Sequence, residues 1–156
     1  MVFFAGQKLT AADLNAAVPL GESQTPSATT FGSTSSTSYT ATLTAAGTVT
    51  QAFVAPASGK ISVTFTASIL PGTAGAFGTI SVGLSGAAGT VAPSDDWQAF
   101  VRSTDGSNAY HGTVERTHDF TGLVPGAAGV ITMYHRASAG SVDFSNRQLK
   151  YRPIGV

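Results

Sequence analysis

The chain has 156 residues, with eight lysines and arginines against eight aspartates and glutamates, so its formal net charge is zero and charged residues make up only 10% of it. It has no excess of positive charge to neutralise phosphates, which argues against a nucleic-acid partner, and its lack of cysteine excludes disulfides, thiol catalysis and cysteine metal sites. No apolar run is long enough for a bilayer span, so membrane insertion is not expected, and the first 14 residues lack the pattern of a secretory signal.

The amino-terminal segment, residues 1–20, is predicted to contain a short helix over Leu9–Ala17. Thr10 and Asp13 have capping-box-like spacing, and Pro19 ends the helix after about two turns. So short a helix is marginal in water unless it docks on something. We therefore expect a docking segment, whose apolar contact residues are Phe3, Phe4, Leu9, Leu14 and Val18.

Residues 21–36 are polar and are punctuated by Pro26 and Gly32, which is typical of a linker. Their last part is expected to enter a first strand near residues 29–31. The head domain is then predicted to span residues 37–156. In its serine- and threonine-rich beginning, Tyr39 and Leu43 are expected to be the buried members of a strand.

The clearest pattern in the chain lies between Gly59 and Pro71. Apolar side chains alternate with hydroxyl side chains from Ile61 to Ile69, with Phe65 at the centre. A period of two gives a strand one apolar and one polar face, and β-branched and aromatic residues favour strands. This stretch is predicted to be the central strand of an antiparallel sandwich.

Strand patterns recur at short spacing through the rest of the chain, with almost no helical periodicity, which indicates an all-β sandwich or barrel. The expected strands are Ser38–Thr44, Thr48–Val54, Lys60–Ile69, Phe77–Ser85, Trp97–Ser103, His111–Thr121, Gly129–Ala137 and Gly140–Tyr151. The last two are expected to form a hairpin across residues 138–140. Pro71-Gly72 and Pro125-Gly126 fit the central positions of type II turns. Within the sheets, burial is predicted for Val63, Phe65, Ala67, Val82 and Leu84.

The histidines do not form a metal-binding pattern. On a strand His111 and Glu115 share a face but lie roughly 13 Å apart, and His118 falls on the opposite face. His135 lies on another strand and is interpreted as polar surface or a buried subunit contact. A serine–histidine–aspartate triad around His118-Asp119 lacks any supporting motif. We therefore expect no enzymatic activity, no metal and no cofactor.

Trp97 is the single tryptophan, and a core position is the first interpretation of it. If exposed, it would offer an aromatic face to a sugar, beside carboxylates that accept hydrogen bonds from hydroxyls. The candidate contacts for a host glycan are Asp95, Asp96, Trp97 and Tyr110. The strand arginines are interpreted as solvated sheet edges or subunit contacts; they are Arg102, Arg116, Arg136 and Arg147.

Both ends of the chain resemble a known class of virion proteins. Phe4–Asn15 is similar to the opening of many minor tail and fibre proteins of tailed bacteriophages of actinobacteria, which often pair an aromatic, a glycine and a leucine with a short helix ending in Leu-Asn. Three distal stretches are similar to the closing hairpin of such domains: Thr121–Gly126, Ile131–Arg136 and Arg147–Ile154. The closing arginine run of that class is reduced here to Arg147 and Arg152.

The resemblance implies a structural virion protein with a jelly-roll-like sandwich of about eight strands, assembled as a homotrimer. It would be made in the host cytoplasm, dock on other virion proteins by residues 1–20 and expose its head, in a role such as host-surface attachment. A tail-tip fibre and a capsid-surface fibre or decoration protein remain alternatives. A free carbohydrate-binding module is the second alternative, and a hydrolase the third.

Overall fold

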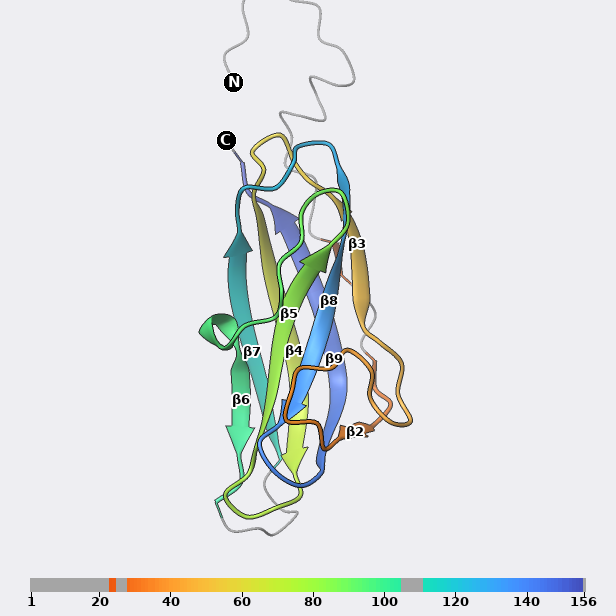
Figure 1. Cartoon of the computed structure of the whole chain (residues 1–156), viewed down its shortest axis with the longest axis vertical. Coiled ribbons are helices and arrows are strands. Elements are labelled where there is room, and N and C mark those ends of the chain that lie inside the picture. Colours follow the sequence, from red (N-terminus) through yellow and green to blue (C-terminus); the bar gives the residue numbers. More distant parts are fainter. Residues whose placement is uncertain (1–22, 25–27, 105–110, 156) are drawn as a thin grey trace, which may run out of the picture.

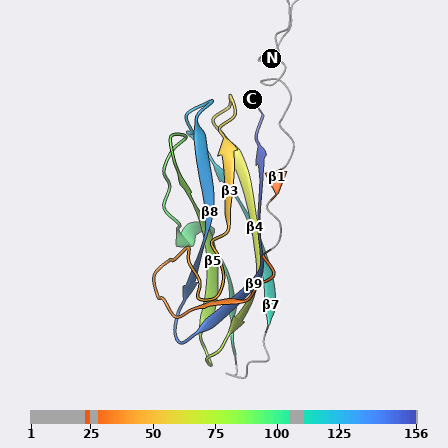
Figure 2. The same ribbon diagram turned by 90° about the vertical axis from the view of Figure 1, so that its right-hand side faces the viewer.

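The computed structural model describes residues 23–24, 28–104 and 111–155, which form two antiparallel sheets packed face to face (Figure 1). Figure 2 shows the two layers from the side. Sheet I contains β1 (Ser23–Gln24), β2 (Gly32–Thr34), β4 (Ile61–Pro71), β7 (Gly112–Phe120) and β9 (Val142–Pro153). Sheet II contains β3 (Thr50–Val54), β5 (Phe77–Ser85), β6 (Ala99–Arg102) and β8 (Ala128–Ala137). The predicted all-β antiparallel sandwich is confirmed, while the predicted helix over Leu9–Ala17 lies outside the described residues.

β4 is the central strand that its alternation predicted. It pairs with β7 on one side and with β9 on the other, so that Phe65 lies between Arg116 and Leu149. The apolar face from Ile61 to Ile69 is fully buried and faces β5, where Val82 and Leu84 are also buried. The hydroxyl face of β4 is less exposed to solvent than an alternating pattern predicts. Ser62 and Ser68 are 4% and 3% exposed, because the side chains of the two flanking strands cover them.

The expected strands from Thr48 to Tyr151 all form, with bounds shifted by at most two residues. The strand expected over Ser38–Thr44 does not form. Thr40 bridges to His135 in sheet II, whereas Thr44 bridges to Ser33 beside sheet I. The segment therefore crosses between the edges of two sheets and cannot remain in one ladder of hydrogen bonds. Leu43 is buried as predicted, and Tyr39 is half-buried.

The predicted hairpin between the last two strands is wrong. β8 pairs with β3 and β5 in sheet II, whereas β9 pairs with β4 in sheet I. The short connection therefore passes from one sheet to the other rather than reversing within one. Gly140 has a left-handed φ of 62° there, and a side chain would collide with Thr73. Since both strands show the same alternation, their patterns could not distinguish a hairpin from a crossing between sheets.

The two Pro-Gly pairs behave differently. Gly126 has a φ of 77° and the Ala127 amide donates to the Val124 carbonyl at 3.2 Å, which fits the expected turn. Pro71 instead ends β4 opposite Val142, and Gly72 does not have the positive φ that a type II turn requires.

The segment interpreted as a linker contributes strands to the sandwich. β2 pairs with β9 through Gly32 and Phe144, and Ala28 bridges to Arg147. β1 pairs with the far end of β9, where Ser23 lies opposite Tyr151. The described chain therefore enters sheet I beside the strand with which it finishes.

Two basic side chains lie inside the sandwich, which corrects the interpretation of His135 as polar surface or a buried subunit contact and of Arg147 as a sheet edge or a subunit contact. His135 and Arg147 are 0% and 1% exposed, and the Arg147 guanidinium donates to the Gly47 carbonyl at 2.9 Å. Asn146, with a φ of 48°, interrupts β9 where its pairing with β4 shifts register. The extra residue reverses the alternation of faces, so Phe144 and Arg147 both point inward.

Candidate functional site

A short 3₁₀ turn, η1 (Asp95–Trp97), lies against the outer face of β5 and carries most of the predicted glycan contacts. The Ser94 hydroxyl caps the turn by accepting from the Asp96 amide at 3.1 Å, and the Ser81 hydroxyl on β5 donates to the Ser94 carbonyl at 3.0 Å. The Trp97 indole N–H donates to the Val82 carbonyl at 2.9 Å. Three hydrogen bonds thus define the turn and hold it on β5.

Trp97 anchors the turn by packing and does not present an isolated aromatic platform. Its ring stacks on His118 of β7, with centroids 4.3 Å apart and planes 17° apart, and Phe120 approaches at 5.9 Å. Burial lowers the pKa of His118, so the imidazole in this stack is kept neutral to lower pH than usual. The half-buried indole joins η1 to β7.

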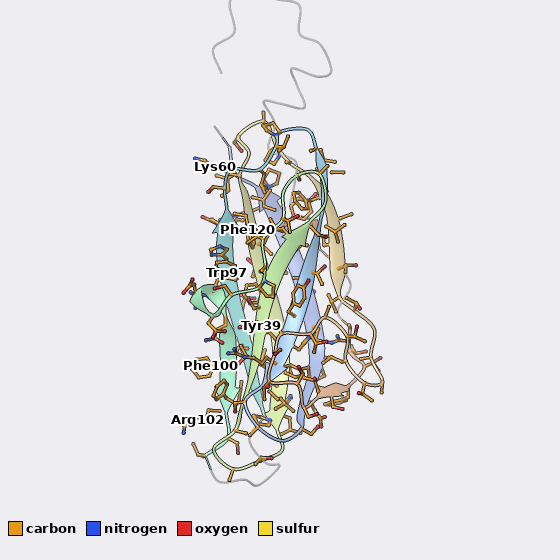
Figure 3. The ribbon with its side chains drawn as sticks, in the orientation of Figure 1. Tyr39, Lys60, Trp97, Phe100, Arg102 and Phe120 are labelled. Atoms are coloured by element: carbon orange, nitrogen blue, oxygen red, sulfur yellow. The ribbon has the colours of Figure 1, made fainter. Side chains whose placement is uncertain are left out.

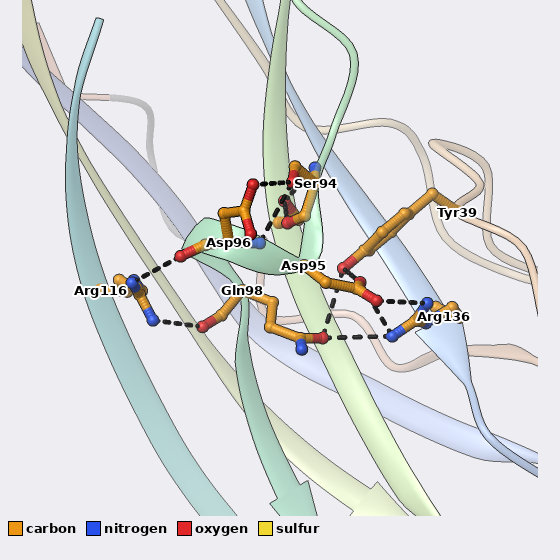
Figure 4. A network of polar contacts seen from close by, with 8 residues as sticks. Tyr39, Ser94, Asp95, Asp96, Gln98, Arg116 and Arg136 are labelled. Carbon is orange, nitrogen blue, oxygen red and sulfur yellow. Dashed lines mark hydrogen bonds and ion pairs between the residues drawn. The ribbon is translucent and has the colours of Figure 1, made fainter.

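Asp95 belongs to a network of polar contacts with three other residues (Figure 4). The Arg136 guanidinium forms an ion pair with the Asp95 carboxylate at 3.0 Å and lies 4.7 Å from the centre of the Tyr39 ring. The Tyr39 hydroxyl donates to Asp95 at 2.7 Å. Arg136 also donates to the Gln98 side-chain oxygen at 3.2 Å. The network ties the 39–40 segment, η1 and β8 together on the outer face of sheet II.

The network changes the titration of two of its members in opposite directions. The hydrogen bond from Tyr39, and then the charge of Arg136, lower the pKa of Asp95. Burial, and then the hydrogen bond to Asp95, raise the pKa of Tyr39. Tyr39 therefore remains a hydrogen-bond donor and Asp95 an acceptor throughout the physiological pH range.

Arg116, on β7, connects the same turn to sheet I. Its guanidinium donates to the Asp96 carbonyl at 2.8 Å and to the Gln98 carbonyl at 3.0 Å. Both acceptors are neutral backbone groups, so these contacts position the turn without cancelling the positive charge of Arg116.

Below the network, a hollow of about 340 Å³ opens on the outer face of sheet II. Phe77 on β5 and Phe100 on β6 supply two phenyl rings, whose centroids are 5.9 Å apart. Phe100 is 55% exposed, an unusual position for a phenylalanine. The described residues that line it are Gly75, Phe77, Gln98, Phe100 and Arg102. Figure 3 shows Phe100 and Arg102 following one another along the outer edge of the sandwich.

The structure brings together only some of the residues predicted as glycan contacts. Asp95 and Asp96 are exposed on η1 beside half-buried Trp97, while Tyr110 lies outside the described residues. The five apolar residues predicted for docking also lie outside them. Sequence reasoning missed Tyr39, Gln98, Phe77 and Phe100 as members of this face. The strand expected over Trp97–Ser103 contains Phe100 and Arg102, but its pattern did not reveal that both side chains face outward.

Among the described residues, no group of three or more histidine, aspartate or glutamate side chains could hold a metal ion. Within the same part of the chain, no helix is both long and apolar enough to cross a membrane. The chemistry that this face can perform is recognition, since it combines aromatic faces with amide and guanidinium donors.

No protein-family model matches the sequence, and no curated protein sequence matches it. Among solved structures, a chain in the structure of infectious bursal disease virus Gx strain matches with 13% sequence identity and a TM-score of 0.42. The match covers 98% of this chain and 37% of that chain. Murine APRIL is 13% identical with a TM-score of 0.38, over 60% and 66% of the two chains. The CBM22-1 xylan-binding domain of Paenibacillus barcinonensis Xyn10C is 11% identical with a TM-score of 0.35, over 90% and 99%. At these values none of the three bears on what this chain does.

Proposed function

We propose that the chain is a structural subunit of a tailed-bacteriophage virion, whose residues 1–20 dock on another virion component and whose sandwich is the exposed head. The observation that carries the proposal is that the described chain begins and finishes near one end of the sandwich, while the exposed aromatic hollow lies toward the other end. Ser23 pairs with Tyr151, and the Ile154 amide donates to the Lys60 carbonyl at 3.0 Å, so the described chain starts and finishes near one end. Phe100 and Arg102 lie toward the opposite end, away from Lys60 (Figure 3).

The docking step has a simple energetic basis. Ordering a peptide costs about 1–2 kcal/mol of backbone entropy per residue, whereas burying a phenylalanine or leucine side chain returns about 1.5–3 kcal/mol. Phe3, Phe4, Leu9 and Leu14 can offset the ordering of residues 1–20 only on a largely preformed surface, such as a virion socket. Three copies in one homotrimer would make attachment persistent through their high effective concentration.

The topology supports the virion assignment at the level of architecture. Sheet I has the order β2-β9-β4-β7 and sheet II the order β3-β8-β5-β6. Each connection from β3 to β4, β4 to β5, β6 to β7, β7 to β8 and β8 to β9 passes between the sheets. We interpret this order as the jelly roll that the sequence resemblance implied. The assignment leaves two sites of attachment, a tail tip or the capsid surface.

A carbohydrate-binding module is the second candidate function, and the exposed aromatic hollow at Phe77 and Phe100 favours it. The two candidates share a binding head and differ in the use of residues 1–20. A free module has no need for an apolar docking segment, whereas a virion subunit depends on it. The discriminating property is therefore incorporation into particles. In both cases we propose recognition and assembly, without catalysis.

The test is a phage carrying the chain with residues 1–20 deleted, beside one carrying Phe3→Ser and Phe4→Ser in the full chain. We expect both changes to abolish incorporation into purified particles, as measured by immunoblot. Phe100→Ala serves as the control and should be incorporated like the unmodified chain. Incorporation of both docking variants at the unmodified level would show that the segment is not a virion anchor. Antibody-labelled micrographs of the unmodified particle would distinguish tail from capsid.

A further inference from the structure

The hollow on the outer face of sheet II has an aromatic wall that the fold does not need for its core. Phe100 is 55% exposed on edge strand β6, and its ring lies 5.9 Å from that of Phe77, at an interplanar angle of 59°. Aromatic faces of this kind stack on the apolar C–H face of a pyranose ring. The volume of about 340 Å³ lies at the small end of ligand sites, which fits one sugar residue better than a large cofactor.

Another part of the lining presents an oriented amide donor. Gln98 lines the hollow, and its side-chain oxygen accepts a hydrogen bond from Arg136 at 3.2 Å. Because a guanidinium can only donate, the oxygen of the amide must face Arg136 and its nitrogen must face away. Among the residues drawn in Figure 4, no contact is marked from this amide nitrogen. The nitrogen is therefore oriented to donate to a ligand oxygen.

Among the described residues that line the hollow, Arg102 is the charged one. Asp95 is engaged by Arg136, and Arg116 donates to backbone carbonyls. Arg102 is exposed in the lining and forms no ion pair with the other described residues. A planar guanidinium matches the two oxygens of a carboxylate.

We propose that this hollow binds a carboxylate-bearing sugar, a uronic acid residue of an acidic polysaccharide. The apolar face of the ring stacks on Phe100 beside Phe77, the sugar carboxylate pairs with Arg102, and a ring oxygen or hydroxyl accepts from the amide of Gln98. Tyr39, Asp95 and Arg136 do not touch the sugar but hold the amide in its orientation. This inference deepens the proposed function. It rests on that function only in assuming that the head of a virion subunit is what meets the polysaccharide, whereas the binding itself is argued from the hollow.

The experiment is calorimetric titration of the full chain with a short oligogalacturonate. A neutral galactose oligomer of the same length and poly-glutamate, which has carboxylates but no sugar ring, are titrated in parallel. We expect binding of the oligogalacturonate, at least about tenfold tighter than either comparison ligand. Because the pairing with Arg102 is exposed, its affinity should also fall as salt rises. Failure of oligogalacturonate to bind, or equal binding of either comparison ligand, overturns the proposal.

The variants assign the binding to this hollow. Phe100→Ala and Arg102→Gln should each weaken oligogalacturonate binding at least about tenfold, and Arg102→Gln should also remove the salt dependence. Matched controls are Phe31→Ala, which removes another exposed phenylalanine (58% exposed), and Arg152→Gln, which removes an exposed arginine on β9. Both controls should bind like the unmodified chain. Unchanged affinity in Arg102→Gln, or equal losses in the controls, refutes the assignment.

Failure of this inference can be told apart from failure of the proposed function. Titrations use the purified chain, whereas the docking test measures incorporation into particles. If incorporation into particles requires residues 1–20 but the purified chain does not bind oligogalacturonate, only the sugar site is overturned. Circular dichroism of each variant verifies folding. Should Phe100→Ala unfold, the exposed substitution Arg102→Gln still decides the outcome.

Discussion

Acidification should destabilise this protein through His135. The imidazole lies between the two sheets with no exposed surface, and its ring meets that of Phe144 at a centroid distance of 4.9 Å. Neither ring nitrogen has a hydrogen bond of good geometry to the described residues, and the backbone of Thr40 raises the pKa of the imidazole only in small part. Burial, and then the charge of Arg147, lower the pKa of His135 from its ordinary 6.5 to about 3. The folded interior therefore holds this histidine in its neutral form.

The direction of the pH effect follows from the difference between the two states. The unfolded chain binds a proton at His135 near pH 6.5, whereas the folded chain does so only near pH 3. The contribution of neutral His135 to the free energy of unfolding is therefore fully present above its pKa in the unfolded chain. It is lost as the pH falls toward its pKa in the folded chain. The loss is about 1.4 kcal/mol per pH unit inside that window, so stability at pH 5.0 should be about 2 kcal/mol below that at pH 7.5. This figure hardly changes for any folded pKa below about 4.

The assay is urea unfolding followed by far-ultraviolet circular dichroism at the same two pH values and one protein concentration. His135→Leu removes the titrating group while nearly conserving volume, and should cost less than about 1.5 kcal/mol at pH 7.5. Its loss of stability on acidification should be smaller than that of the unmodified chain by about 2 kcal/mol. His111→Gln, at an exposed position, is the control for replacing a histidine.

Equal acid losses in His135→Leu and the unmodified chain would refute the reasoning, because they would mean that folding does not exclude a proton from this position. His118, whose pKa is also lowered by burial, destabilises in the same direction. Since His118 is present in both proteins, its contribution cancels in the comparison.

Three further predictions concern the core, metal ions and assembly. Phe65→Ala should lower the free energy of unfolding by about 3–5 kcal/mol, because Phe65 is fully buried, whereas Thr64→Ala on the outer face should cost less than about 1 kcal/mol; similar losses in urea unfolding would contradict the assigned faces. Dialysis against a chelator should leave the melting temperature unchanged, and a fall that one particular ion restores would reveal a metal site. The chain should be a homotrimer, so light scattering at micromolar concentration should give about three times the 15.7 kDa protomer mass, and a monomer mass would reject the trimer.

Local patterns were sufficient for the strands from β3 to β9 and for the face that the central strand buries. Between Ile61 and Ile69 the alternation is uninterrupted, and β4 buries the apolar side chains that it predicted. Only one register of such a strand buries its apolar side chains, because a shift by one residue would move every one of them to the solvent face. Strand propensity, burial and pairing therefore all favour the same arrangement. Gly126 could be placed for a similar reason, since the turn needs a left-handed residue after a proline.

Where both faces of a strand carry apolar side chains, as on β6, alternation separates the two faces but cannot say which one meets the core. On β6, Val101 points inward against Gly112, where a larger residue would collide with it, so Phe100 and Arg102 are left outside. On β9 the irregularity at Asn146 turns Arg147 inward against the expected pattern.

The candidate site depends on contacts between segments that lie far apart in the chain. Tyr39 meets Asp95 across 56 positions of sequence, and Arg136 meets Asp95 across 41. A hairpin between β8 and β9 would have satisfied the same local preferences as the crossing that forms. Packing of the two sheets selects between such alternatives. It determines which strands pair by hydrogen bonds in one sheet and which side chains are buried against one another. Strands β3 to β9 and the core face of β4 are therefore properties of local sequence, while the hollow and its network exist only once both sheets have assembled.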